Sequence, residues 1–185
     1  MIDLASGPFL FDTSAEGWFH RNQTPVMASW MRDYLIHNEI HLSAVSVIER
    51  IRGYSLLWTR ATPAHRDRIE RARIAYLENL GRIWPVDSAI SVVAGEIMAL
   101  CPDAPTPPKR SHRMAESRQE RLARWRFDIL IAATALVTRM PLIHNNALDF
   151  ESIRGAIEAS PHRFPNLGPL QLIRCASLLP FPRLC

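Results

Sequence analysis

The sequence lacks a long apolar run, a cysteine framework and all but one lysine. None of its hydrophobic runs approaches the roughly 20 residues that span a bilayer, and the residues after Met1 do not form a basic and then apolar secretion leader. The three cysteines form no CxxC pair, which argues against a disulfide framework or a zinc site. We therefore expect a soluble protein in a reduced, cytoplasmic setting, with no membrane partner.

The scarcity of lysine excludes several classes of site. Lys109 is the only lysine and lies in a proline-rich stretch, so the chain has no lysine for a phosphate-binding P-loop, a kinase site or a Schiff base. Arginine supplies every other basic side chain except histidine. Its planar guanidinium suits phosphate groups, and the formal net charge of +4 is compatible with a polyanionic partner.

Strand-like apolar runs alternate with helical patterns along the 185 residues. Helix starts are indicated at Thr24-Pro25, Thr62-Pro63 and Asp87. This alternation favours parallel strands joined by right-handed crossovers. We predict one α/β domain over residues 1–185, with a central, mostly parallel sheet of about five strands. The predicted strands are residues 9–11, 41–45, 82–86, 140–143 and 170–175.

Two segments complete this outline. The helix that starts at Thr62-Pro63 is predicted to bury Ile69, Ala72, Tyr76 and Leu80 before Gly81 ends it, while its mixed-charge outer face faces solvent. Residues 101–110 are too rich in proline for regular helix or central strand, and a polar, arginine-rich helix over residues 116–126 follows them.

Four acidic residues stand where short apolar runs begin or end. An acid at the end of a buried strand, or at the start of the next helix, lies at the edge where α/β sheets bind ligands. Carboxylates gathered there repel one another unless protons or a cation neutralise them, and hard divalent metals bind oxygen ligands. The pattern predicts a metal-dependent site. Its members are Asp12 after residues 9–11, Glu49 after 42–48, Asp128 before 129–136 and Asp149 after 141–146.

The acids lie in four motifs: Phe-Asp-Thr-Ser at 11–14, residues 43–53, Phe-Asp-Ile-Leu-Ile-Ala-Ala at 127–133, and Asn-Ala-Leu-Asp-Phe at 146–150. Each motif alone occurs by chance, but the four together, in this order over nearly the whole chain, resemble the PIN-domain family. Within it, they look most like the VapC-like toxins of bacterial toxin–antitoxin pairs. The resemblance implies a PIN-like three-layer α/β/α fold and a metal-dependent endoribonuclease.

By motif match, Asp12, Glu49, Asp128 and Asp149 would hold one or two Mg²⁺ or Mn²⁺ ions. Thr13, Ser14 and Asn146 match polar positions that orient those carboxylates or contact metal through water. The resemblance also implies an RNA substrate, a cognate antitoxin that blocks the site, and a homodimer. The apolar helix around Trp30 and Tyr34 is suited to a dimer contact or equally to a core face.

Phosphodiester hydrolysis needs an activated water and stabilisation of the charge that develops on the phosphate oxygens. Two cations about 3.5–4 Å apart supply both, so no histidine or lysine base is required. We rank Asp12 and Asp128 first as direct ligands, then Glu49, with Asp149 acting through water or on a second metal.

The chain departs from the family pattern in two places. His144 stands where the family usually has Thr or Ser, so it is either a tolerated replacement or a contact to the scissile phosphate. Residues 102–126 form a Pro/Arg-rich insertion before the third acid. Its cations, above all Arg118 and Arg121, are candidates for RNA contact, although a solvated arm has the same composition.

Other interpretations remain open. Asp128 and Asp149 could be helix caps, and Glu49 a buried acid paired with arginine. A haloacid-dehalogenase phosphatase needs a second Asp where Ser14 stands, and a response-regulator receiver needs adjacent acids and a strand-end lysine; both are disfavoured. Within the PIN-like group, a housekeeping or DNA-directed nuclease, or a module that binds RNA or a partner without cutting, has the same motifs.

Overall fold

The computed structural model describes residues 7–21, 24–106 and 117–178. Short parallel strands alternate with helices over these ranges, as the sequence predicts. The elements are β1 (Leu10–Phe11), α1 (Thr13–Arg21), α2 (Pro25–His37), β2 (His41–Ser43), α3 (Ala44–Arg60), α4 (Pro63–Glu78), β3 (Arg82–Trp84), α5 (Ser88–Leu100), α6 (Arg118–Thr138), β4 (Leu142–His144), α7 (Ala147–Ala159), η3 (Pro161–Arg163), β5 (Leu172–Arg174) and η4 (Cys175–Leu178).

The strands form one five-stranded sheet in the order β3-β2-β1-β4-β5, and every pairing is parallel. The chain moves outward from β1 to β3 on one side, then crosses back to place β4 on the other side of β1. The strand order therefore reverses between β1 and β4. Ligands of open α/β sheets bind beyond the carboxyl ends of the strands at such a point, and Asp12 and Asn146 follow those two strand ends.

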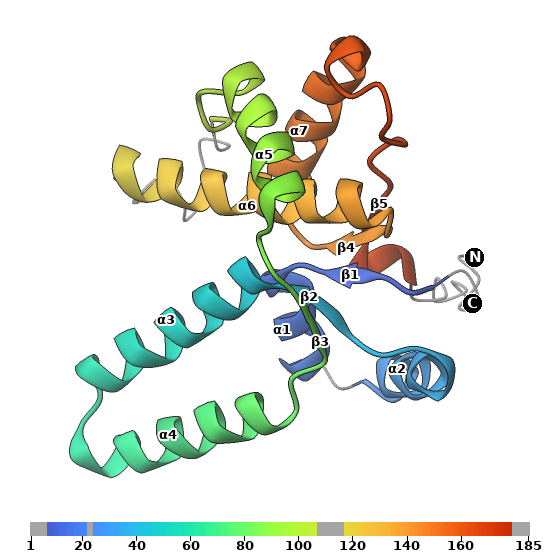
Figure 1. Ribbon diagram of the computed structural model, residues 1–185. Coiled ribbons are helices and arrows are strands. Elements are labelled where there is room, and N and C mark those ends of the chain that lie inside the picture. Colours follow the sequence, from blue (N-terminus) through green and yellow to red (C-terminus); the bar gives the residue numbers. More distant parts are fainter. Residues whose placement is uncertain (1–6, 22–23, 107–116, 179–185) are drawn as a thin grey trace, which may run out of the picture.

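Alternating side chains of the sheet feed two separate cores. Leu10 packs with α5, α6 and α7, whereas Phe9 and Phe11 pack with α1 and α2 on the opposite face. Figure 1 shows these two helical layers above and below the strands. The three-layer α/β/α fold is thus confirmed. Among the described residues, no helix combines the length and apolar content needed to cross a membrane.

The lower core is built from stacked aromatic rings. Tyr34 is fully buried, stacks on Trp30 and Phe9, and accepts a hydrogen bond from the Phe9 backbone N–H at 3.1 Å. Trp30 is only 8% exposed and also stacks on Phe19. Of the two roles open to this part of α2, the structure therefore favours a core face, because these rings are not available to a second copy.

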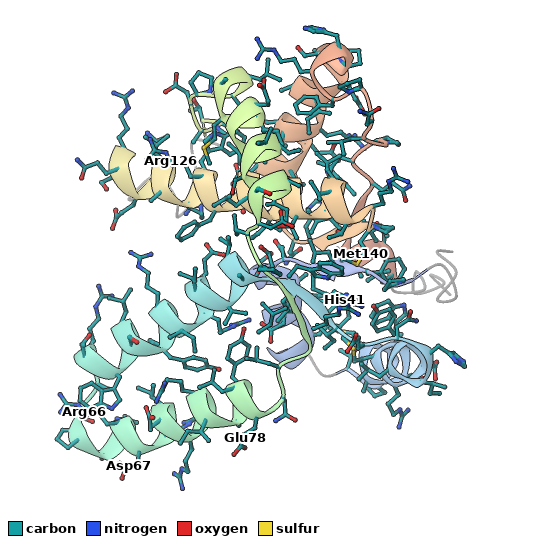
Figure 2. All side chains as sticks on the ribbon, viewed as in Figure 1. His41, Arg66, Asp67, Glu78, Arg126 and Met140 are labelled. Carbon is teal, nitrogen blue, oxygen red and sulfur yellow. The ribbon has the colours of Figure 1, made fainter. Side chains whose placement is uncertain are left out.

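Helices α3 and α4 form a hairpin that projects away from the sheet (Figure 1). The predicted buried face of α4 is wrong, because no residue of this helix is buried. Helix α3 is its main packing partner among the described elements, and Ile74 and Leu77 are left about two-fifths exposed. Figure 2 places Arg66 and Asp67 at the far end of the hairpin and Glu78 near the body of the protein.

The arginine-rich segment is the first half of α6, not a separate helix in an insertion. Ser117 caps this helix, and Glu120 closes a capping box with it. The helix then continues without interruption to Thr138, so Asp128 lies in its interior. The prediction that Asp128 starts an element was wrong, and the helix-cap interpretation of this residue is excluded. Residues 107–116 lie outside the described ranges.

All five strands differ from the predicted ranges at one or both ends, and the second and fourth show why. The second strand ends at Ser43, whose hydroxyl accepts from the Val45 backbone N–H and so caps α3. The fourth strand runs over Leu142–His144, beginning later and ending one residue beyond the predicted range. Ser43 lies between two apolar residues and His144 ends an apolar run, so hydrophobicity alone does not show that the first is a helix cap and the second a strand end.

Candidate active site

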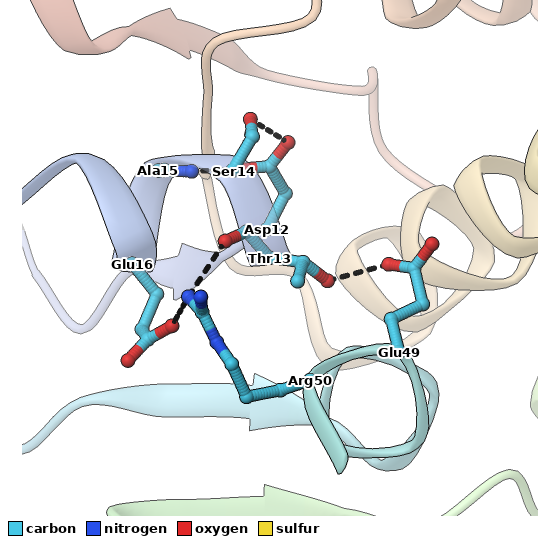
Figure 3. A network of polar contacts seen from close by, with 7 residues as sticks. All are labelled: Asp12, Thr13, Ser14, Ala15, Glu16, Glu49 and Arg50. Atoms are coloured by element: carbon cyan, nitrogen blue, oxygen red, sulfur yellow. Dashed lines mark hydrogen bonds and ion pairs between the residues drawn. The ribbon is translucent and has the colours of Figure 1, made fainter. Parts of the chain in front are cut away.

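Asp12 is fixed at the carboxyl end of β1 by hydrogen bonds from both sides. Its backbone N–H donates to the Ile143 oxygen of β4 at 3.0 Å. Its carboxylate accepts from the Ala15 backbone N–H and, at 2.8 Å, from the Ser14 hydroxyl (Figure 3). Asp12 therefore also caps α1, since an acid before a helix satisfies its free N–H groups. Only 3% of the residue is exposed.

Glu49 approaches the same place from α3. The Thr13 hydroxyl donates to its Oε2 at 2.6 Å (Figure 3). Burial raises the pKa of Glu49, while the Thr13 hydrogen bond and the charge of Arg124 oppose that rise. Glu49 is half-buried; its carboxylate accepts from the Thr13 hydroxyl, and the charges of Arg124, Arg52 and Arg50 act against the rise in its pKa. The arginine-paired interpretation therefore stays a prediction beside the threonine contact.

Asp128 and Asp149 are joined through one amide. Asn146, two residues after the end of β4, donates from Nδ2 to Asp128 Oδ2 at 3.0 Å and also to Asp149 Oδ2. Both carboxyl groups are nearly buried, with 6% and 5% of each residue exposed. The N-cap of α7 is Asn146 and Asp149 lies in the first turn, so Asp149 gains from the helix dipole as well.

These residues surround a cleft of about 350 Å³ at the point where the strand order reverses. Six of the predicted site residues line this cleft: Asp12, Thr13, Ser14, Glu49, Asp128 and Asn146. Asp149 is not part of the lining and is linked to the cleft by its hydrogen bond from Asn146. Each of the three polar residues donates a hydrogen bond to an acid, which is the orienting geometry that the motif match implies. The lining residues are Asp12, Thr13, Ser14, Glu49, Arg50, Arg124, Asp128, Ile131 and Asn146.

A comparison with protein families gives one family for most of the chain. The family model described as PIN domain matches residues 9–155. The chain belongs to the PIN domain family. The match includes all four acids and every element from β1 to the middle of α7.

Solved structures share this fold at low sequence identity. VapBC2 from Rickettsia felis, bound to a promoter DNA fragment, gives a TM-score of 0.55 at 14% identity, over 90% of this PIN domain chain and 97% of that chain. DNA-bound VapBC from Salmonella typhimurium gives 0.56 at 16%, with the same coverage. FitAcB from Neisseria gonorrhoeae gives 0.51 at 19%, over 79% and 93%. No curated protein sequence matches significantly.

Two acids of this PIN domain, Asp12 and Asp128, have raised pKa values. Burial, followed in the same direction by the charge of Glu49, raises the pKa of Asp12 to about 7 against the hydrogen bonds from Ala15 and Ser14. Burial and then the charges of Asp149, Asp12 and Glu49 raise the pKa of Asp128 well above its usual range. Protons or a cation must therefore offset the repulsion within the cleft.

The donor set fits a hard divalent cation. It offers carboxylate, hydroxyl and amide oxygens, and neither cysteine nor histidine lines the cleft. Within the described ranges, no three acidic, histidine or cysteine side chains converge tightly enough to enclose an ion by themselves. Mg²⁺ accepts such an open arrangement, because it keeps several waters and binds few protein ligands directly.

Of the predicted RNA contacts, the two arginines lie on α6 and differ in placement. Arg118 is 85% exposed and lies 3.7 Å from Asp103, whereas Arg121 is half-buried. Arg121 and Arg124 precede Asp128 by seven and four residues, so all three share one helix face. Arg124 lines the cleft. Helical periodicity through Asp128 would have singled it out from the sequence.

His144 is fully buried at the end of β4, with its ring 5.1 Å from that of Phe150. Neither ring nitrogen has a hydrogen-bond partner, and burial lowers its pKa to about 4. The placement argues against the predicted contact with a scissile phosphate. It favours the alternative, a tolerated apolar-facing replacement.

Proposed function

We propose that this PIN domain is a metal-dependent endoribonuclease and the toxin of a type II toxin–antitoxin pair. The observation that carries the proposal is the cleft where Asp12, Glu49 and Asp128 meet, with Asp149 behind Asn146. Buried carboxylates with raised pKa values are costly unless they serve a ligand. Family membership supports nuclease chemistry for such a set.

In this proposal the acids divide the work by position. Asp12 and Asp128, the most buried acids of the cleft, are direct ligands; Glu49 is the next, and Asp149 acts through water or on a second ion. Bound Mg²⁺ or Mn²⁺ would supply the activation of water and the neutralisation of phosphate charge. Ser14, Thr13 and Asn146 hold the carboxylate oxygens in place, as their hydrogen bonds indicate.

The substrate class follows from charge near the cleft. Arg124 at the rim and Arg121 one helical turn away present guanidinium groups suited to phosphate oxygens. An extended polyanion such as RNA is the ligand that this arrangement supports.

The partners are proposed from similarity. The structural neighbours are toxin–antitoxin complexes by their names, VapBC and FitAcB. We extend to this chain an antitoxin that covers the cleft and, as an associated property, a homodimer. A cytoplasmic site of action accompanies an RNA target.

Cleavage of labelled total RNA by wild-type protein and by Asp12→Asn, in Mg²⁺, Mn²⁺ or EDTA, tests the activity. Asp67→Asn provides the matched control, because Asp67 is an exposed acid at the tip of the α3–α4 hairpin. We expect metal-dependent cutting by wild type and Asp67→Asn and none by Asp12→Asn. Folded, antitoxin-free wild type that binds RNA but cuts in no metal would instead make the chain a binding module.

A further inference from the structure

A buried ion pair lies beside the cleft and has no part in the roles given above. Arg50 of α3 pairs with Glu16 of α1, and the two side chains are only 20% and 6% exposed. The surface ion pairs of α4 and α7 join neighbours on one helix, whereas this pair joins two helices. A buried pair of this kind adds little net stability because desolvation of both charges opposes it.

The same guanidinium also reaches the cleft wall. Arg50 Nη2 donates to the Thr13 backbone oxygen at 3.1 Å as well as to Glu16 (Figure 3). Thr13 in turn holds Glu49 through its hydroxyl at 2.6 Å. Glu16, Arg50, Thr13 and Glu49 thus form one continuous chain of contacts, in which Thr13 is fixed from its carbonyl side and fixes Glu49 from its hydroxyl side.

An aromatic ring of α4 also restricts the Arg50 side chain. Its guanidinium carbon lies 5.8 Å from the centre of the Tyr76 ring of α4. Arg50 and Glu16 also line a larger cavity of about 880 Å³ between α1 and the α3–α4 hairpin. Because carbonyl, carboxylate and ring already engage the guanidinium, Arg50 is set up to brace the site rather than to bind a phosphate.

We propose that Arg50, held by Glu16, is a positioning residue that sets the Glu49 carboxylate through Thr13. The inference rests on the proposed metal-dependent function. A glutamate side chain has several rotatable bonds, so an unbraced Glu49 would spend part of its time away from the ion. Partners of metal ligands commonly change metal affinity or activity by about 10- to 100-fold when removed.

The variant must avoid leaving a buried charge unpaired, because Arg50→Met alone would strand the Glu16 carboxylate and could unfold the protein. The test therefore uses the double variant Glu16→Met/Arg50→Met, which keeps side-chain volume and removes both charges. Glu70→Met/Arg73→Met is the matched control, an ion pair on the exposed surface of α4. Thr13→Val and the combination of Thr13→Val with the double variant complete a cycle.

Four quantities are measured on each folded variant: kcat and KM for RNA cleavage, Mn²⁺ affinity by calorimetry, and thermal stability. We expect the Glu16/Arg50 double variant to lose about tenfold or more in kcat and in Mn²⁺ affinity, with KM and stability near wild type. In the Thr13→Val background the same double variant should cause little further loss, because both changes break one chain of contacts. The α4 control should match wild type.

Wild-type kcat and Mn²⁺ affinity in the folded double variant would overturn the inference and leave the proposed nuclease intact. Losses that simply add to those of Thr13→Val would also overturn it, since Arg50 would then act by another route. A rise in KM alone would make Arg50 an RNA contact and reject the positioning role. If wild type cuts no RNA, the proposed function fails, and the Mn²⁺ cycle still decides whether Arg50 positions Glu49.

Discussion

Asp12 and Asp128 are carboxylates whose charged forms the fold disfavours, because burial raises the pKa of both. The folded-state pKa of Asp12, about 7, exceeds its ordinary value of 3.8. An acid with a raised folded pKa stabilises the protein at low pH, and this stabilisation is lost as pH rises from 3.8 through about 7. At pH 8 without metal, the folded protein therefore bears the full repulsion of the cleft.

Asp12→Asn should for this reason stabilise the metal-free protein. At pH 8 in EDTA we expect the free energy of unfolding to rise by at most about 4 kcal/mol, and at pH 5 the gain should shrink. Added Mg²⁺ should stabilise wild type but not the variant. Thermal melts in EDTA and Mg²⁺ measure this; a variant less stable than wild type at pH 8 would show that Asp12 serves mainly as the cap of α1.

His144 gives a pH dependence of the opposite sign. Its folded pKa of about 4 lies below the ordinary 6.5, so the neutral ring is favoured in the fold. The stability it permits is complete above pH 6.5 and is lost as pH falls from 6.5 toward 4. The cost should reach about 3 kcal/mol at the acid end.

The variant His144→Leu places an apolar side chain against Phe150, and this side chain cannot bind a proton. The difference in unfolding free energy between wild type and this variant should change by about 3 kcal/mol between pH 7.5 and pH 4, in favour of the variant. Comparing the two proteins removes the opposing trend of the cleft acids. The exposed His162→Gln is the control, and a flat difference across this range would mean that the buried ring accepts a proton readily.

At the residue scale, the sequence was enough to select the four acids as candidates, because acids are conspicuous beside apolar runs. All four predicted acids lie in or next to one cleft, and each predicted polar helper donates to one of them. Arg50 and Glu16 were missed because their pairing depends on how α1 and α3 approach in space. Nothing in the spacing of residues 16 and 50 encodes that approach.

At the scale of elements, Gly81 was predicted to end α4, but the structure requires glycine there for a different reason, a close backbone contact. The helix α4 ends at Glu78, and Asn79 caps it. A Cβ at position 81 would lie 2.0 Å from the Ile40 carbonyl oxygen, which also accepts from the Arg82 backbone N–H at 2.8 Å. Glycine is needed here because two backbone segments meet at the start of β2 and β3.

Gly81→Ala should cost about 2–3 kcal/mol of unfolding free energy, because backbone must shift to admit the methyl group. Gly155→Ala is the matched control at an exposed position of α7, where an added Cβ meets nothing within 4 Å. It should gain up to about 1 kcal/mol from helix propensity. Urea titrations of both variants measure the effects. Equal free energies of unfolding for the two variants would mean that the backbone before β2 and β3 shifts to admit the methyl group without loss of stability.

The α3–α4 hairpin shows that apolar periodicity predicts a helix but not whether its apolar face is covered. The apolar spacing of α4 correctly gives a helix, but it does not reveal whether a partner covers the face. Among the described elements α3 is the main partner of α4, and Leu57 and Ile74 remain substantially exposed. The same limit applies to α6, where the arginine-rich and apolar halves looked like two elements although one capped helix joins them.

At the scale of the whole molecule, strand and helix alternation was enough to predict a parallel sheet, because parallel strands need crossovers. The strand order was beyond reach, and it decides the site. β1 is the central strand, and the strand order reverses between it and the adjacent β4. The residues that follow β1 and β4 therefore lie next to each other at the same edge of the sheet. The α6 helix then crosses this point and brings Asp128, with the basic side chains before it, over the strand ends.

This arrangement predicts where RNA runs across the molecule. Arg121 and Arg124 share the Asp128 face of α6, whereas Arg68 and Arg71 are exposed on the distant α4. Binding of single-stranded RNA is measured with Asp12→Asn protein in EDTA, so that no cutting occurs. Adding Arg121→Gln/Arg124→Gln should weaken binding and lower the slope of log K against log salt by about 1.4, since each phosphate contact contributes about 0.7.

Arg68→Gln/Arg71→Gln removes the same charge from the α4 surface and serves as the control. It should leave the salt slope within about 0.3 of the parent, because these side chains lie off the proposed path. Arg118→Gln should have an intermediate effect, since Arg118 is exposed to solvent and lies beside the opposite charge of Asp103. Equal slope changes for the α6 and α4 pairs would mean that RNA senses only the net charge of the protein, and the path along α6 would be rejected.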